Sequence, residues 1–202
     1  MFNVIKIKRR LKYSYIAAFA GFLFGFDTIV ISGVDQKLQE LWNSTDLFHG
    51  LVVVGMALWG TVIGAIFGGL PTNYFGRKKT LLWIGYLYSI SAIGSAICSD
   101  PVSFAFFRFL GGVGIGISTI AAPAYISEIS ASNERGKLVG YYQLNIVIGI
   151  LSAFVSNFFL KELGDSSWRI MIGIEAIPAI IYTIMIFYIS QSPRWIFVNG
   201  DI

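Results

Sequence analysis

The stretch FGFDTIVISG, residues 24–33, closes an apolar run that begins at Tyr13 and holds one carboxylate, Asp27. A hydrocarbon core about 30 Å thick requires about 20 consecutive apolar residues to be crossed by a helix. The run 13–34 is long enough, and it lacks the small-residue cleavage site of a removable signal peptide. It therefore predicts a transmembrane helix, in which an acid is costly and requires an explanation.

Five further apolar runs of similar length follow. The chain has 202 residues, of which 55% are hydrophobic and 13% charged, whereas about a quarter of residues are charged in soluble domains. We expect an all-α polytopic membrane protein with six transmembrane helices. The predicted spans are 13–34, 48–70, 80–98, 102–126, 138–159 and 169–189. The alternation of basic loops favours two inverted three-helix repeats, although no sequence repeat is evident.

Lys and Arg gather in alternate connections and so report orientation. The net charge of +4 could suggest nucleic acid, but its distribution predicts instead a plasma (inner) membrane protein with both termini cytoplasmic. We expect a cytoplasmic basic tail (1–12), a six-helix domain (13–190) and a cytoplasmic end segment (191–202). The basic residues behind this topology are Lys6, Lys8, Arg9, Arg10, Lys12, Arg77, Lys78, Lys79, Arg135 and Lys137.

Enzymatic features are missing from the sequence. Cys98 and His49 are each the only residue of their type, so we expect no disulfide and no metal cluster, and we interpret His49 as a polar boundary residue. The glycine-rich segment 111–116 lies in an apolar helix without a preceding strand, which favours helix packing over phosphate binding. Pro123 and Pro178 are expected to kink their helices. No nucleophile or cofactor loop remains, so we predict a protein without cofactor that is not an enzyme.

Three charged residues lie inside the predicted spans: Asp27 in the first, Arg108 in the fourth and Glu175 in the sixth. Such residues usually mark ion or substrate pathways. Asp27 and Arg108 could form a fixed ion pair that only holds helices together. Alternatively, Asp27 could take up and release a proton with Arg108 as its partner, because separating the two would change its proton affinity. Glu175 could assist, or could face a water-filled vestibule.

Gln143 in the fifth span carries both a donor and an acceptor, which suits the hydroxyls of a polyol. Phe24 lies one turn before Asp27, so these positions could line one cavity. A hydrogen bond between helices is the alternative role for Gln143.

Several motifs together resemble one family. They are FGFDTIVISG (24–33), GLPTNYFGRKKT (69–80), FRFLGGVGIGIS (107–118), PAYISEISASNERGKLVGYYQ (123–143) and SQSPRWIF (190–197). In this order they resemble the N-terminal half of sugar porters of the major facilitator superfamily, over nearly the whole chain. The pattern is most similar to bacterial proton-coupled sugar symporters of the xylose and galactose type.

The resemblance implies roles for residues at matching positions. Asp27 stands where proton-coupled members have an acid, and Arg108 matches its partner. Gln143 matches a glutamine that binds the sugar, and Phe24 an aromatic residue beside it. A cytoplasmic charge network is implied for Asn73, Gly76, Arg77, Lys78, Glu128 and Arg135, with Gly69 part of the same loop motif. The partners implied are a monosaccharide, a proton and the lipid bilayer.

Two features depart from the family. Asn73 stands where many members of the superfamily have aspartate, and Gln191 stands where the family usually has glutamate, so the implied network lacks a negative charge at each of these positions. The family also has twelve spans, with the substrate between two six-helix halves. We therefore expect half of a sugar-proton symporter, with the second half in a longer chain, a separate chain or a second copy. The alternatives are a facilitative carrier or a truncated membrane protein without transport activity. Without a second half, Asp27, Arg108 and Gln143 are expected to face water or lipid.

Overall fold

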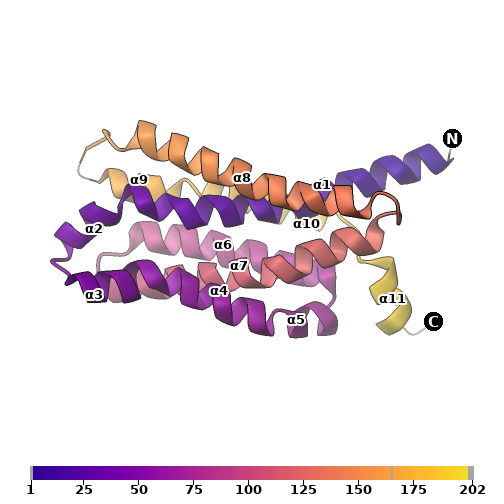
Figure 1. Ribbon diagram of the computed structural model, residues 1–202, viewed down its shortest axis with the longest axis horizontal. Helices are drawn as coiled ribbons and strands as arrows, with labels where there is room; N and C mark the ends of the chain where they lie inside the picture. Colours follow the sequence, from indigo (N-terminus) through magenta and orange to yellow (C-terminus); the bar gives the residue numbers. More distant parts are fainter. Residues whose placement is uncertain (1, 165, 200–202) are drawn as a thin grey trace.

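The computed structural model describes residues 2–164 and 166–199, which are helical with short connections (Figure 1). The α-helices are α1 (Phe2–Val30), α2 (Asp35–Leu41), α3 (Asp46–Phe48), α4 (Gly55–Phe67), α5 (Gly69–Tyr74), α6 (Arg77–Ile97), α7 (Pro101–Ile129), α8 (Arg135–Leu160), α9 (Ser167–Gly173), α10 (Ala176–Phe187) and α11 (Pro193–Asn199). A 3-10 turn (Ile31–Gly33) follows α1, and a π-helical turn (His49–Val54) precedes α4.

Six helical segments of the described chain are long and apolar enough to cross a membrane, which confirms the predicted number. They are Arg9–Gly33, Asp46–Phe67, Arg77–Ile97, Pro101–Ile129, Arg135–Leu160 and Ser167–Phe187. The boundaries differ from the predicted ones by a few residues. The largest difference lies at the N-terminus, where α1 begins at Phe2, so the basic segment 2–12 continues the first transmembrane helix.

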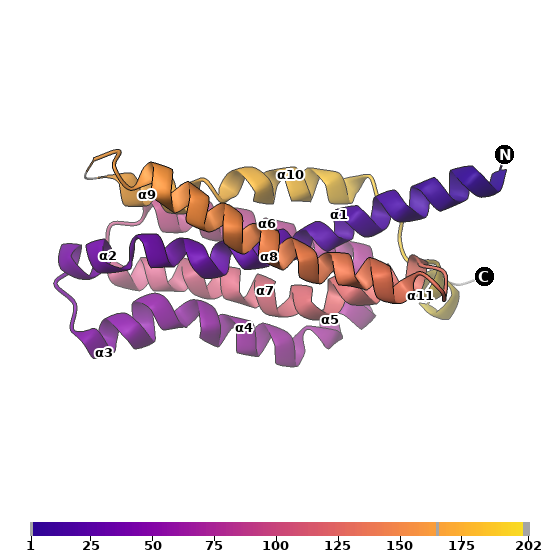
Figure 2. The ribbon, with the colours of Figure 1, turned by 45° about the horizontal axis from the view of Figure 1, so that its top comes forward.

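The most extensive helix contacts join α1 to α8 and α4 to α7 (Figure 2). Both depend on glycines, because an added Cβ would meet the partner backbone: Gly25 lies against Ile146, and Gly64 against Val113. In span numbers the pairs are one with five and two with four. Exchanging spans one to three with four to six converts each pair into the other. The packing therefore has the symmetry expected of two three-helix repeats.

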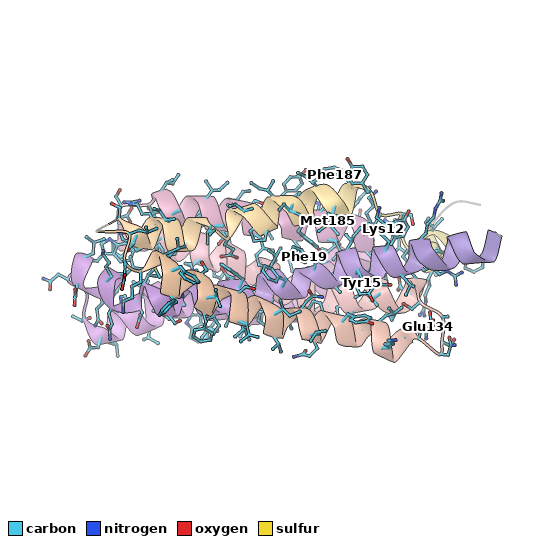
Figure 3. The ribbon with its side chains drawn as sticks, turned by 90° about the horizontal axis from the view of Figure 1, so that it is seen from above. Lys12, Tyr15, Phe19, Glu134, Met185 and Phe187 are labelled. Atoms are coloured by element: carbon cyan, nitrogen blue, oxygen red, sulfur yellow. The ribbon has the colours of Figure 1, made fainter. Side chains whose placement is uncertain are left out.

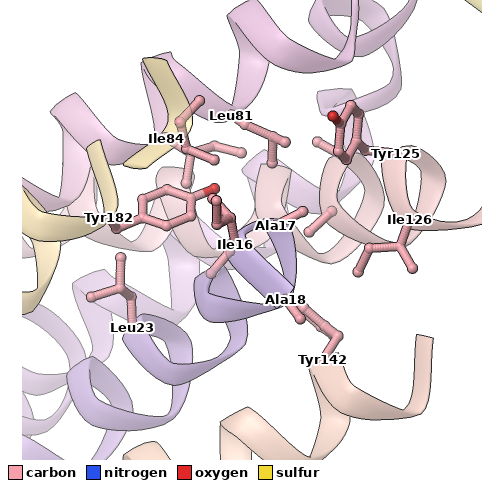
Figure 4. Packing of buried hydrophobic residues seen from close by; sticks show 14 of the residues in the cluster. Ile16, Ala17, Ala18, Leu23, Leu81, Ile84, Tyr125, Ile126, Tyr142 and Tyr182 are labelled. Carbon is pink, nitrogen blue, oxygen red and sulfur yellow. The ribbon is translucent and has the colours of Figure 1, made fainter. Parts of the chain in front are cut away.

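The main core lies between α1, α6, α7, α8 and α10 (Figure 4). Its side chains are mostly alanine, isoleucine and leucine, with tyrosines among them. Small residues on α1, such as Ala17 and Ala18, are fully buried and let this helix pass through the middle of the bundle. Because the chain spans a membrane, outward-facing apolar residues have lipid as their natural surroundings. Many lie on α4 and α8, and Figure 3 shows side chains projecting from all sides of the bundle.

The sixth span is interrupted. Helix α9 ends at Gly173 and α10 begins at Ala176, so Ile174 and Glu175 form a turn between them. Pro178 explains the break, because it has no N–H to donate to the carbonyl of Ile174. The N–H of Ile177 donates to that carbonyl instead, at 3.1 Å. In the fourth span, by contrast, α7 continues through Pro123.

Candidate functional site

The structure brings Asp27 and Arg108 together in the middle of the bundle. Asp27 belongs to α1 and Arg108 to α7, and the guanidinium Nη1 donates to Asp27 Oδ1. The second terminal nitrogen, Nη2, donates to the backbone carbonyl of Asp27 at 3.0 Å. The two residues are only 1% and 2% exposed. The arginine therefore holds both the carboxylate and the helix that carries it.

The expectation that Asp27 and Arg108 would face water or lipid is wrong. The ion pair is enclosed by the helices of this chain alone, with α6 and α10 packed around α1 and α7. Gly111 explains part of this enclosure, because it has no side chain where α7 meets Ser91 of α6. A Cβ at Gly111 would also lie 3.8 Å from Asp27 Oδ1. The physical reason is the close packing of these helices through small residues, while the ion pair offsets part of the cost of removing both charges from water.

Glu175 lies in the break of the sixth span and is 1% exposed. It therefore does not face an open vestibule in this structure. Its carboxyl is close enough to Asp27 and Arg108 to interact electrostatically with both. Two acids thus lie near one arginine.

Three polar atoms of this site lack a hydrogen-bond partner among the described residues. They are Oδ2 of Asp27, Nε of Arg108 and Oε2 of Glu175. Buried polar groups are nearly always paired, and an unpaired one costs about 1–3 kcal/mol. This site thus has more unpaired hydrogen-bonding groups than a purely structural ion pair would have. An added proton has acceptors available to it.

The predicted sugar-binding residues lie on a different surface. Gln143 of α8 is exposed, and its side chain makes no hydrogen bond to any described residue, so it does not join two helices here. Phe24 of α1 is half-buried and packs against the core. Gln143 is next to Tyr142, whose backbone meets α1 at Gly21. The side-chain amide of Gln143, on the face beside α1, is suited to hydrogen bonding with a ligand.

A second cluster of charges lies at the end of the bundle that carries the basic loops. Arg77 at the start of α6 forms an ion pair with Glu128 near the end of α7, with 2.8 Å between Nη2 and Oε1. The guanidinium also donates to the carbonyl of Thr72 at 3.2 Å. The other carboxylate oxygen of Glu128 accepts from Ser192 at 2.5 Å. This cluster ties the connection before α6, the end of α7 and the chain after α10 to one another.

Gln191 stands where the family usually has glutamate, and it caps α6. Its Oε1 accepts from the backbone N–H of Lys78 at 2.8 Å. The amide therefore satisfies one of the donors left free at a helix N-terminus, as a carboxylate would, but without charge. Gly76 precedes α6 with φ of 85°, a conformation that glycine adopts at little cost. The Nζ of Lys78 donates to the carbonyl of Phe187 at 3.0 Å.

Two residues predicted for the charge network do not join it through their side chains. Arg135 is exposed at the start of α8 and pairs with no described residue. The side chain of Asn73 is exposed, and only its backbone carbonyl takes part, accepting from Trp195 Nε1 at 2.7 Å. Trp195 thereby connects α11 to α5, the short helix that contains Asn73.

Sequence reasoning missed some polar contacts. His49, predicted to be a boundary residue, is buried, with Nε2 2.8 Å from Asp35 and Nδ1 3.1 Å from Ser44. Asp35 and Ser44, close to it in the sequence, were a possible signal. Cys98 is a buried thiol whose pKa is raised by burial. The buried tyrosines of the spans were also missed, because their aromatic rings counted only as core.

Residues 13–202 match the family model described as "Sugar (and other) transporter". A "Glucose transport protein" of Synechocystis is 39% identical over 98% of this chain and 45% of its own length. The D-xylose-proton symporter of Escherichia coli K12 is 33% identical over 92% of this chain and 44% of its own length.

A solved structure of the proton:xylose symporter XylE bound to 6-bromo-6-deoxy-D-glucose has the same fold. The TM-score is 0.89 at 30% identity, covering 96% of this chain and 48% of that one. The chain thus spans about half the length of these relatives. Its family model covers nearly all of the six-helix bundle, including the buried ion pair and the charge cluster. The chain therefore belongs to the family of sugar and related transporters.

Proposed function

We propose that this chain is the N-terminal half of a carrier that moves a monosaccharide together with a proton across the plasma (inner) membrane. The single observation that carries the proposal is the buried group of Asp27, Arg108 and Glu175, which has two acids for one arginine. A carboxylate that binds and loses a proton inside the membrane is what coupling to a proton gradient requires. The relatives named as proton symporters support this assignment.

Asp27 is the proposed proton acceptor, and Arg108 sets its proton affinity. While the guanidinium contacts Asp27, the carboxylate is stabilised and the proton is disfavoured. A shift of α1 against α7 would weaken this contact and favour protonation. Glu175 lies at the break in the sixth span, where a change in the turn alters its distance to Asp27. In this proposal, helix movement and proton occupancy are therefore linked.

Phe24 and Gln143 are proposed to contact the sugar. The amide of Gln143 can both donate to and accept from hydroxyl groups, and the ring of Phe24 offers an apolar surface to the sugar's C–H groups. The relatives' greater length supports a second six-helix half that covers this surface and completes the binding site. Alternating access would then follow from rocking of the two halves.

We further propose that both termini face the cytoplasm. The basic residues of the loops before α6 and before α8 support this orientation. In the Cys98→Ser background, a cysteine at Gly136 should react with a membrane-impermeant maleimide only from the cytoplasmic side. A cysteine at Asn43, on the opposite end of the bundle, should react only from outside. The reverse pattern would overturn the orientation.

The coupling role is tested in the complete carrier that contains this sequence. Asp27→Asn should abolish uphill accumulation of sugar in proteoliposomes with an imposed proton gradient, so that the internal sugar concentration no longer exceeds the external one. Exchange of labelled sugar at equal concentrations on both sides should continue, because exchange needs no net proton movement.

Asp100→Asn is the matched control, since it makes the same chemical change at an acid exposed outside the spans. It should leave accumulation and exchange unchanged. Accumulation by the Asp27→Asn carrier would show that Asp27 is only structural. Uptake in the unmodified carrier that ignores the proton gradient would favour a facilitative carrier instead.

A further inference from the structure

A cavity of about 770 Å³ lies among the described residues at the end of the bundle opposite the basic loops. Three segments line it: residues 32–40, which include α2, the last turns of α8 and the start of α9 (Figure 2). Ligand pockets in proteins typically measure about 300–1,000 Å³. No residue assigned above to proton coupling or to sugar binding lines this cavity, so it is a separate feature of the bundle.

Asn157 of α8 brings an unpaired polar atom to the wall of this cavity. The residue is only 7% exposed, and its Nδ2 donates to the backbone carbonyl of Val30 at 3.2 Å. Its Oδ1 has no hydrogen-bond partner among the described residues. Gly33 makes room for this amide, because an added Cβ would lie 2.5 Å from Asn157 Cγ. Buried polar atoms are nearly always paired, so an unpaired acceptor in a cavity wall indicates a bound ligand or an ordered water.

The described charged residues of the cavity balance one another. Two acids and two lysines line it: Asp35, Lys37, Glu40 and Lys161. The Nζ of Lys37 donates to the carbonyl of Gly164 at 3.1 Å and so ties α2 to the connection after α8. Equal numbers of positive and negative groups give no net attraction to an anion or to a cation. Together they offer donors and acceptors, which suits a neutral ligand with several hydroxyl groups.

Aromatic side chains form the apolar part of the cavity wall. Phe154 and Phe158 lie one turn apart on α8 and are 52% and 77% exposed. Trp168 of α9 is buried beside them in the lining. Small-molecule sites are usually built in this way, with apolar and aromatic walls and a few polar groups that fix the orientation of the ligand. Rings of this kind can pack against the C–H groups of a sugar while the polar groups bind its hydroxyls.

The cavity continues the face on which sugar binding is proposed. On the first span, Thr28 lies one turn beyond Phe24, and Ser32 follows in the 3-10 turn, where it lines the cavity. On α8, Phe154 lies three turns beyond Gln143 on the same side of the helix. These eleven residues of α-helix span about 16 Å. The cavity is therefore displaced from Gln143 along one face, toward the end that we assign to the outside.

We propose that this cavity is an outer binding site for a monosaccharide, which a sugar occupies before it moves along the face of α1 and α8 to Phe24 and Gln143. The choice of ligand rests on the proposed function, whereas the site itself rests on the cavity and its lining. Asn157 accepts a hydroxyl proton through Oδ1, and Phe154 and Phe158 contact the apolar side of the sugar ring. The outer site belongs to this chain alone and needs no second half to form.

The site is tested by thiol protection on the 202-residue chain in lipid nanodiscs, where no transport is required. In the Cys98→Ser background, Ser32→Cys places a thiol in the cavity wall, and Asn43→Cys places one at the same end of the bundle outside it. D-glucose or D-xylose is added before a maleimide. At about ten times its Kd, a sugar in the cavity should slow labelling of Ser32→Cys about 10-fold. Labelling of Asn43→Cys should not change, and L-glucose should protect neither thiol.

Substitution of Asn157 tests whether its amide binds the sugar. Asn157→Ala should raise the sugar concentration that gives half protection about 3- to 10-fold. Asn145→Ala is the matched control, because it makes the same change on α8 at an amide that donates to the carbonyl of Tyr141 at 2.8 Å. It should leave protection unchanged. If Asn157→Ala does not fold, Phe158→Ala removes a largely exposed ring from the cavity wall and should weaken protection likewise.

Several outcomes would overturn the outer site. They are no protection of Ser32→Cys by either D-sugar, or equal protection by L-glucose. Labelling that sugar does not affect, but that is slow in nanodiscs and fast in detergent, would assign the cavity to a lipid headgroup instead. Sugar transport by the complete carrier without protection would refute the outer site alone. Protection in the chain without sugar transport by the complete carrier would support the site and refute the proposed function.

Discussion

The two charged clusters of this molecule differ in how completely their polar groups are satisfied. At the loop end, Glu128 uses both carboxylate oxygens, one toward Arg77 and one toward Ser192. In the middle of the bundle, Asp27 and Arg108 are more deeply buried, yet each keeps an unpaired polar atom. The first arrangement holds segments together. The second retains spare hydrogen-bonding capacity, as a site must if its protonation and contacts change.

The largest effect is expected from Arg108→Leu. This change leaves Asp27 and Glu175 buried without a positive partner, and removing one member of a buried pair typically costs about 3–5 kcal/mol. Thermal unfolding of the purified chain in detergent measures it. The double variant Asp27→Asn with Arg108→Leu should regain most of the loss. Equal stability of the Arg108→Leu chain and the unmodified one would mean that the pair is already separated in solution.

A smaller effect is expected from Glu128→Gln at the loop end. The ion pair with Arg77 is partly exposed, with 16% of the Arg77 side chain accessible. The expected loss of stability is about 1–2 kcal/mol. The chain after α10 should also detach more often, which faster trypsin cleavage after Arg194 would reveal. A loss as large as that of Arg108→Leu would contradict the distinction drawn between the two clusters.

Gln191 allows the effect of a neutral and a charged helix cap to be compared beside the ion pair of Arg77 and Glu128. Gln191→Ala removes the cap from α6 and should cost about 1 kcal/mol. Gln191→Glu keeps the acceptor and adds a negative charge at a helix N-terminus, which should stabilise the chain by about 0.3–1 kcal/mol. Thermal unfolding of both variants beside the unmodified chain tests this. Destabilisation by glutamate would show that neutrality at this position is required.

The smallest effect is expected at Asp100, outside the spans. The backbone N–H of Ser103 donates to its carboxylate at 2.8 Å and lowers the pKa of Asp100 below its ordinary value. A carboxyl with a lowered folded-state pKa stabilises the protein above its unfolded pKa. That contribution is lost as the pH falls through the folded value. Asp100→Asn should therefore flatten the fall in melting temperature below about pH 4. An unchanged acid profile would contradict the assignment.

Much of the site could be inferred from the sequence because charge inside an apolar run is rare. Asp27, Arg108 and Glu175 were identified in this way, and the structure brings all three together. The hydrogen bond between Tyr142 and Ser118 was not predicted, since an aromatic residue in a span is equally compatible with apolar packing. Arg135 was assigned to the charge network by its place in a motif, but its exposed side chain pairs with no described residue.

By itself, the sequence determined the helical class, the six spans and the identity of the intramembrane charges, because a membrane requires long apolar helices and penalises each charge strongly. Only the tertiary structure decided that Asp27 and Arg108 are enclosed within one half and that the sixth span breaks at Glu175. It also decided that Glu175 is buried near that pair. These features depend on which helix faces meet, and glycines on α1, α4, α7 and α8 set that geometry through backbone contacts between segments far apart in sequence.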